Sequence, residues 1–160
     1  MTTINNINAI FENIGASHLQ INEVFIGQDY DIAASAKVNH VLLAVNPVSS
    51  VLPKTDNGYT FQTVDYTVKV VDLVDKDLGN QQEVLSDTLS IIKDVVKLLN
   101  QNPIYYDASL NIVGDINFNT LDGVFDTDVT GWETSFTLEF PSGLGYCSSP
   151  FDMCCITIKR

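Results

Sequence analysis

Basic side chains are scarce in this sequence. Eight Lys and Arg residues stand against 20 Asp and Glu residues, which gives a formal net charge of −12, and the only arginine is Arg160. Proteins that bind nucleic acid tightly gather Lys and Arg on one face, where these side chains displace counterions from the phosphates. The sequence has no such basic patch. The composition therefore argues against tight nucleic-acid binding and predicts a surface that repels a duplex.

Long apolar runs and targeting signals are also missing. The longest uninterrupted apolar runs are short, as in residues 41–45, whereas a bilayer-spanning helix needs about 20 apolar residues. The first residues contain neither the basic start nor the apolar block of a signal peptide. We therefore expect no membrane segment, and a protein that is kept in a cytoplasm or packed into a particle there.

Cysteine and histidine are too few and too badly spaced for most site chemistry. The three cysteines, Cys147, Cys154 and Cys155, all fall near the end of the sequence, and an odd count cannot form the paired framework of a small secreted domain. We interpret them as reduced thiols that act as small hydrophobic side chains. The two histidines, His18 and His40, form no zinc-binding spacing with each other or with the cysteines.

Apolar residues nevertheless make up 45% of the chain, which is enough for one domain with a real core. Apolar positions recur every three or four residues across 4–14, which predicts a helix with Thr2 or Thr3 as N-cap and Gly15 as its stop. A second helix is predicted over 80–99. Its polar side chains form one narrow stripe, so it is either deeply buried or makes a second protein contact.

Alternating or β-branched patterns predict five strands. They cover residues 19–26, 40–48, 59–74, 111–118 and 131–140. A loop over 49–58 contains the turn signal Asn57–Gly58. The strand over 59–74 would span roughly 50 Å at about 3.3 Å per residue, while a globular domain of this size is roughly 35 Å across. This strand must therefore bend, break at a bulge, or protrude.

The order of these elements predicts an α+β fold. We expect one antiparallel or mixed β-sheet with two main helices packed on one face. Residues 1–141 would form this single domain, and residues 142–160 an extended C-terminal tail. The tail is either an arm for a neighbouring subunit or a segment that returns to its own core.

Two pairs of closely spaced aspartates are the nearest approach to a catalytic or metal motif. Asp75 with Asp77, and Asp126 with Asp128, could hold calcium or magnesium through oxygen ligands. Neither pair has the further ligands and glycine of a calcium loop, so we interpret them as solvated turn carboxylates. The sequence predicts no catalytic residue, cofactor or metal ligand. A metal-dependent small-molecule enzyme that uses these turns is the alternative from a different functional class.

Three segments together carry a resemblance to a known family. They are the helix over 4–14, the strand over 60–74 with the following residues to 88, and the strand over 131–141 closed by residues 147–151. In this layout the chain resembles the neck and tail ring proteins of tailed bacteriophages, which include tail terminators and tail-completion proteins. The abundance of Asn, Asp, Ile and Val is similar to phages of Bacteroidetes hosts, including the crAss-like group. The resemblance rests on layout and composition rather than on a short motif.

The resemblance implies a structural virion protein without catalysis. Such a protein would be assembled in the bacterial host cytoplasm and reside in the neck or tail of the virion. It would form a homo-oligomeric ring, sixfold or twelvefold, that contacts neighbouring neck and tail proteins and surrounds the channel crossed by DNA. A tail-tube or baseplate component is the alternative within the same class.

Candidate contact residues follow from this reading, because an over-long strand supplies an edge or projection for strand addition. One set lies on a single face of the long strand: Val64, Tyr66, Val68 and Val70. A second set lies in the tail: Phe151, Met153, Cys154 and Cys155. Three carboxylates are candidates for the surface that faces the DNA channel: Asp72, Asp75 and Asp77.

Overall fold

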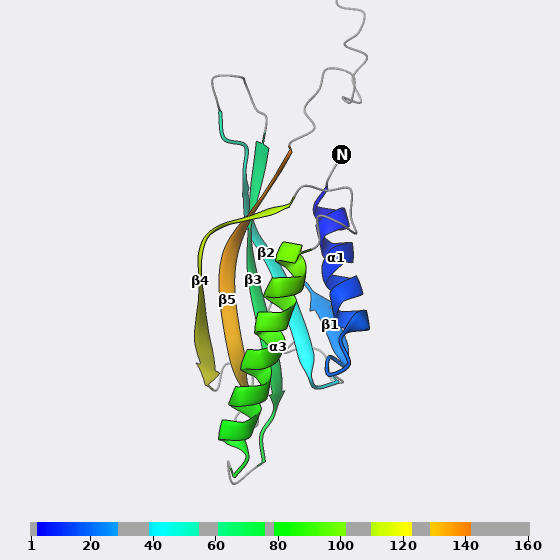
Figure 1. The fold of residues 1–160 in the computed structure, drawn as a ribbon, viewed down its shortest axis with the longest axis vertical. Coiled ribbons are helices and arrows are strands. Elements are labelled where there is room, and N and C mark those ends of the chain that lie inside the picture. The colour runs from blue at the N-terminus through cyan, green and yellow to red at the C-terminus, as the bar shows by residue number, and fades with distance from the viewer. Residues whose placement is uncertain are drawn as a thin grey trace, which may run out of the picture.

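The computed structural model describes residues 3–28, 39–54, 61–75, 79–101, 110–122 and 129–141. The elements, in chain order, are α1 (Ile4–Ser17), β1 (Glu23–Ile26), β2 (Leu42–Val51), β3 (Phe61–Leu73), α3 (Gln81–Gln101), β4 (Asn111–Asp122) and β5 (Val129–Pro141). The strands form one sheet in the order β1-β2-β3-β5-β4, in which only the β1–β2 pair is parallel. Both helices lie on the same face of this sheet (Figure 1). The predicted α+β fold with a mixed sheet is therefore confirmed.

Helix α1 begins where the sequence indicates but runs past its predicted stop. Thr3 is the N-cap, and its hydroxyl accepts a hydrogen bond from the Asn6 N–H while the Asn6 side chain accepts one from the Thr3 N–H. Gly15 does not end the helix, which continues to Ser17. Gly15 is instead a packing point, because a Cβ atom there would lie 2.0 Å from Cγ2 of Val24 in β1. The glycine lets α1 approach the sheet closely.

The long central strand β3 is matched by long neighbours. All 13 residues of β3 pair with β5, and β2 pairs on its other side with a register shift between Pro47 and Ser49. Of the three alternatives for the long strand, β3 protrudes: the β2–β3 end of the sheet extends beyond the helices (Figure 1), and the irregularity in the β2–β3 pairing lies in β2. The domain accommodates its long strand by being elongated rather than spherical.

Strand β2 reaches Val51, beyond the predicted end at residue 48, despite a proline in its interior. Its parallel partner β1 pairs only as far as Val45, and the last backbone hydrogen bond there runs from the Gly27 N–H to the Val45 carbonyl. Pro47 therefore lies on a sheet edge, where its missing N–H removes no bond of the ladder.

The core lies between the helices and one face of the sheet. Phe11 of α1 packs against Tyr66 of β3 with ring centroids 5.5 Å apart, and the Tyr66 hydroxyl donates to Oδ1 of Asn8 at 3.3 Å. Burial raises the pKa of Tyr66 to about 12, because the phenolate loses its hydration. Trp132 of β5 donates from Nε1 to the Leu85 carbonyl at 2.8 Å, which ties α3 to the sheet.

Candidate assembly surface

The four strand residues predicted as an oligomer interface belong to the chain's own core. Val64, Tyr66, Val68 and Val70 are at most 1% exposed and pack in one cluster with residues of both helices. The prediction must be corrected, because the apolar face of a strand is also the face that helices need for packing. Nor does β3 offer a free edge, since it lies between β2 and β5.

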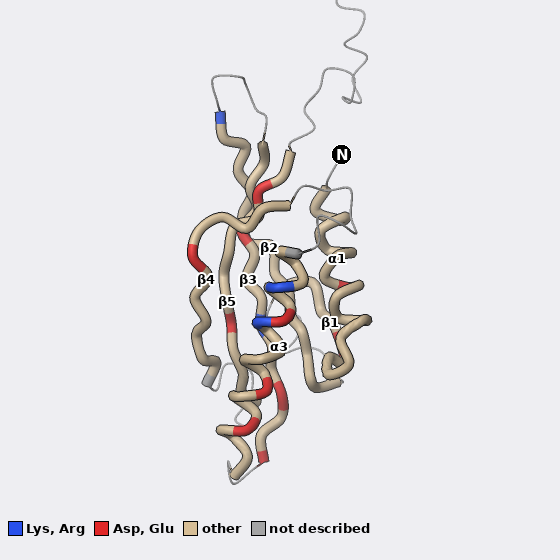
Figure 2. The backbone as a smooth tube through the Cα atoms, in the orientation of Figure 1, with Lys and Arg blue, Asp and Glu red and all other residues tan. Residues whose placement is uncertain are grey.

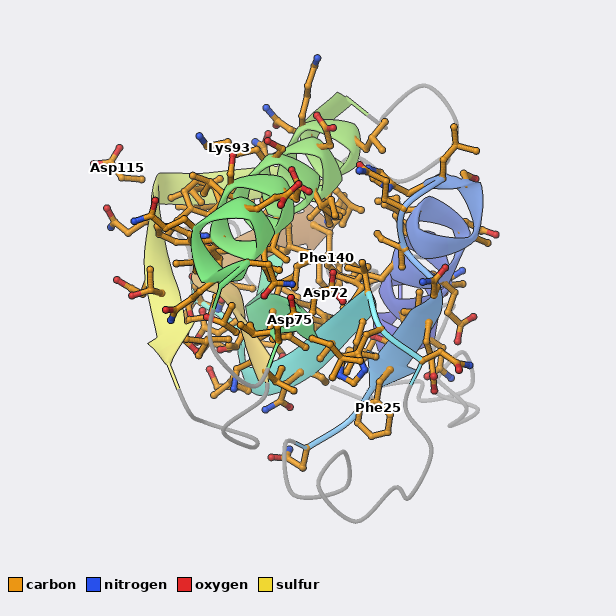
Figure 3. All side chains as sticks on the ribbon, turned by 90° about the horizontal axis from the view of Figure 1, so that it is seen from below. Phe25, Asp72, Asp75, Lys93, Asp115 and Phe140 are labelled. Carbon is orange, nitrogen blue, oxygen red and sulfur yellow. The ribbon has the colours of Figure 1, made fainter. Side chains whose placement is uncertain are left out.

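The predicted channel-facing carboxylates lie at the opposite end of the sheet from the β2–β3 projection. Asp72 is half-buried near the end of β3, and Asp75 is exposed just after it. The Asp75 N–H donates to Oδ1 of Asn80 at 2.8 Å, which connects this end of β3 to the start of α3. Figure 3, which views the molecule from this end, labels both carboxylates. Whether they face a channel stays a prediction.

Several predicted residues lie outside the described part of the chain. They are Asp77, Asp126, Asp128, Phe151, Met153, Cys154 and Cys155. Within the described part, no three His, Cys, Asp or Glu side chains lie close enough to hold a metal ion.

The sheet face away from the helices carries a ladder of polar side chains. At its centre, Asp65 of β3 accepts hydrogen bonds from the Ser49 hydroxyl on β2 and from Oγ1 of Thr137 on β5, the latter at 2.6 Å. These two donors stabilise the carboxylate and lower the pKa of Asp65 below its usual 3.8, Ser49 contributing more. Each donor comes from a different neighbouring strand, so the aspartate joins three strands through its side chain.

The same face continues with two further cross-strand pairs between β3 and β5. Thr67 and Ser135 are linked through their hydroxyl oxygens at 3.0 Å. Next to them, Nζ of Lys69 lies 3.8 Å from Oε2 of Glu133, and Lys69 is only 6% exposed. These pairs form because residues directly opposite each other on antiparallel strands point to the same face. We call this surface, on the side of the sheet away from α1 and α3, the open face.

The open face is not polar along its whole length. Toward the end of the sheet that carries Asp72, a small apolar cluster is buried on the side of the sheet away from the helices. Figure 3 labels Phe25 of β1, which packs against this cluster. The members of this cluster are Leu42, Ala44, Val71 and Leu121. The open face is therefore apolar and buried at this end of the sheet, and polar in its middle.

At the other end, four apolar side chains are exposed where β2 ends and β3 begins. Val48 is 61% exposed, Val51 55%, and Leu52 and Phe61 42% each. We call these four residues the hairpin-end cluster. Sequence reasoning assigned most of this region to a loop and missed the cluster, although its apolar residues flank a turn signal as paired strand ends do.

The two edges of the sheet differ in how well they are protected. Strand β4 pairs with β5 on one side only, and its register shifts between Val113 and Asn117 around Gly114, which has a φ of 86°. A bulge of this kind twists an edge away from further pairing. On the opposite edge, β1 pairs with β2 only over Leu42–Val45. Beyond Val45, the outer side of β2 has no strand beside it in the described part of the chain, while its inner side stays paired with β3.

Acidic side chains outnumber basic ones in the described part of the chain. Figure 2 shows acidic positions on helices and strands, while the basic positions of the described residues are few, with two of them near each other on α3. None of the described helices is long and apolar enough to cross a membrane. No model of a known protein family matches the chain, and a comparison with curated protein sequences gives no match either.

Proposed function

We propose that this chain is a structural subunit of a bacteriophage neck or tail. In this role it forms a homo-oligomeric ring, sixfold or twelvefold, that joins the portal or neck to the tail and surrounds the channel through which DNA passes. The observation that carries the proposal is the pairing of an open sheet face with an exposed apolar cluster at its projecting end.

The physical argument starts from the exposed apolar side chains. Single exposed apolar residues are ordinary on a protein surface, whereas several of them at one end of a projecting element favour a contact site. The hairpin-end cluster lies where β2 ends and β3 begins, at the end of the sheet that extends beyond the helices (Figure 1). A contact between this end of one copy and a different surface of the next is heterologous, and heterologous contacts generate closed rings when the rotation closes.

The charge of the chain suits a subunit beside a DNA channel. With a net charge of −12, the surface repels phosphates, so DNA would pass through a lumen lined by such subunits without adhering to it. Asp72 and Asp75 lie at the end of the sheet opposite the hairpin-end cluster. If the cluster makes the contact between copies, these carboxylates remain free to face the channel.

Native mass spectrometry across a concentration series, followed by negative-stain imaging, tests the proposal. We expect a discrete closed oligomer with a central hole. Long stacked tubes would instead support a tail-tube component. A monomer at every soluble concentration would contradict self-assembly into a ring.

A further inference from the structure

We propose that the hairpin-end cluster binds residues 151–158 of a second copy of this chain, added beside the free part of β2. The inference rests on the proposed assembly function and names the contact that would hold neighbouring copies together. Both partners in the contact belong to the same sequence, so each copy would donate one segment and accept another.

The acceptor surface is fixed by the strand register. Val51 pairs with Thr63, and Phe61 pairs with Pro141, so the Val51 and Phe61 side chains point to the same open face of the sheet. Val51 is the last residue of β2, and beyond Val45 that strand has no neighbour on its outer side in the described residues. The surface thus offers both apolar side chains and backbone groups of an edge strand, the two features that strand addition uses.

The edge imposes a limit on where the added segment pairs. Pro47 has no N–H to donate, and the register shift after it interrupts the strand. Pairing is therefore restricted to the end of β2 around Ser49–Val51. In this contact the apolar side chains of the hairpin-end cluster bury most of the surface, and the few backbone hydrogen bonds set the orientation of the added segment.

The donor segment has the composition of a strand. Residues 151–158 read Phe-Asp-Met-Cys-Cys-Ile-Thr-Ile. In an extended strand Cys154, Ile156 and Ile158 would share one face, and Phe151, Met153 and Cys155 the other, so that the segment would be apolar on both faces apart from Asp152 and Thr157. This argument uses the sequence alone, because these residues lie outside the described part of the chain.

The position of the donor segment allows it to reach a neighbour. It follows Pro141, which pairs directly with Phe61 in the acceptor region. Residues 142–150 lie between them and can span roughly 30 Å when extended. Strand β5 thus ends at Pro141 on the side of the sheet where the acceptor surface lies, and the nine residues that follow supply the length of chain that the proposed contact needs.

Charge favours the same pairing. Residues 142–160 contain two basic residues, Lys159 and Arg160, and one acidic residue, so their formal net charge is +1. Because the whole chain has a net charge of −12, residues 1–141 have a net charge of −13. Asp65 and Glu139 lie on the open face next to the hairpin-end cluster, since Asp65 pairs with Thr137 and Thr63 with Glu139. Lys159 and Arg160, which directly follow the segment, would therefore be attracted to these two carboxylates.

A second copy is the occupant that fits an assembling subunit. A segment that returned to its own sheet would fill the acceptor and leave nothing to connect copies. A segment donated to the next copy produces a head-to-tail contact, which uses different surfaces on the two partners and so propagates around a ring.

Two full-length variants separate donor from acceptor. Phe61→Asp damages the acceptor and leaves the donor intact, while Ile156→Asp does the reverse. We expect each variant alone to lose the oligomers of the unmodified chain, with association weakened more than about tenfold. Mixed together, with one variant labelled with nitrogen-15, they should form dimers containing one of each, because each mixed pair retains one intact contact.

The controls keep the result interpretable. Val113→Asp changes an exposed residue on β4, away from the acceptor, and should assemble as the unmodified chain does. Thermal unfolding checks that each variant is folded, and Val51→Asp replaces Phe61→Asp if the latter is not. All species are compared by native mass spectrometry under reducing conditions.

Each contrary result has a distinct meaning. If both single variants assemble as the unmodified chain does, the inferred contact is wrong while the proposed assembly function stands. If each variant is monomeric but the mixture forms no mixed dimer, the segment does not pass between copies and the inference is overturned. A monomeric unmodified chain contradicts the assembly function itself.

Discussion

The two faces of strand β3 are built from adjacent residues of one segment but have different roles. Even-numbered side chains such as Tyr66 are buried beneath the helices, and odd-numbered ones such as Asp65 and Thr67 bond to neighbours across the open face. The helix-covered face gains stability by removing apolar surface from water. The open face pairs its polar side chains across the strands, and Asp65 and Thr67 remain partly exposed there. Contact with partners is therefore to be sought on the face and ends that folding does not use.

The largest loss of stability should come from removing a buried side chain on the face of β3 that the helices cover. Tyr66→Ala removes a fully buried aromatic side chain and should lower the free energy of unfolding by about 3–5 kcal/mol. Urea denaturation followed through the fluorescence of Trp132 measures this, because Trp132 is the only tryptophan of the chain. Thr67→Ala, on the other face of the same strand, is the matched control and should cost much less. Equal losses for the two variants would refute the division between the faces.

A smaller loss is expected where the sheet itself is tightly packed. A Cβ atom at Gly131 would lie 2.0 Å from the Val70 carbonyl oxygen, so Gly131→Ala should force β5 away from β3 and cost about 1–3 kcal/mol. The same denaturation experiment measures the loss. Ser135→Ala changes an exposed residue of the same strand and should leave stability nearly unaltered. Normal stability of Gly131→Ala would show that the two strands are less closely apposed than described.

The stability that the open face contributes should depend on pH. Hydrogen bonds from Ser49 and Thr137 lower the pKa of Asp65 below its usual 3.8, so this carboxylate contributes stability above pH 3.8 that is lost as the pH falls through the lowered pKa. Asp65→Asn should reduce that acid dependence and cost about 1 kcal/mol or less at neutral pH. Carbon-13 NMR titration of the carboxyl groups measures the pKa directly. Asp115→Asn controls for the change in net charge, and an Asp65 pKa at or above 3.8 would contradict the hydrogen-bonded arrangement.

The smallest effect on folding should occur at the hairpin-end cluster. Phe61 is 42% exposed, and Phe61→Ala should alter the free energy of unfolding by less than about 0.5 kcal/mol, as is usual for exposed positions. Phe140, which pairs with Gln62 and is 1% exposed, is the matched control, because Phe140→Ala should be strongly destabilising. A large loss for Phe61→Ala would mean that this side chain serves the fold rather than a contact.

Much of the fold could be predicted because local patterns were strong. The three- and four-residue spacing of α1 and the alternation in β3 and β5 gave element types that the structure confirms. The errors lie at boundaries. Gly15 is read as a stop from sequence, yet it is a packing point against Val24, and no local pattern records which residue of another element will approach a glycine.

The candidate contact residues were predicted less well. Val64, Tyr66, Val68 and Val70 were chosen as an interface because they form an apolar strand face, but an apolar stripe has the same pattern whether it meets a helix of its own chain or a partner. The hairpin-end cluster was missed because exposure depends on where β1 ends and how far the sheet extends beyond the helices. Both are properties of the assembled sheet.

The sequence by itself determined the class of the fold, the acidic charge and the periodic faces of each helix and strand, because these follow from residue chemistry and from interactions between residues close in the chain. Only the tertiary structure decided which face of the sheet the helices cover and which apolar side chains remain in solvent. These depend on strand order and register, which bring together residues such as Asp65 and Thr137 that are far apart in the chain. Burial is a property of those long-range contacts, and for this reason the surface that we propose for assembly could be identified only in the folded chain.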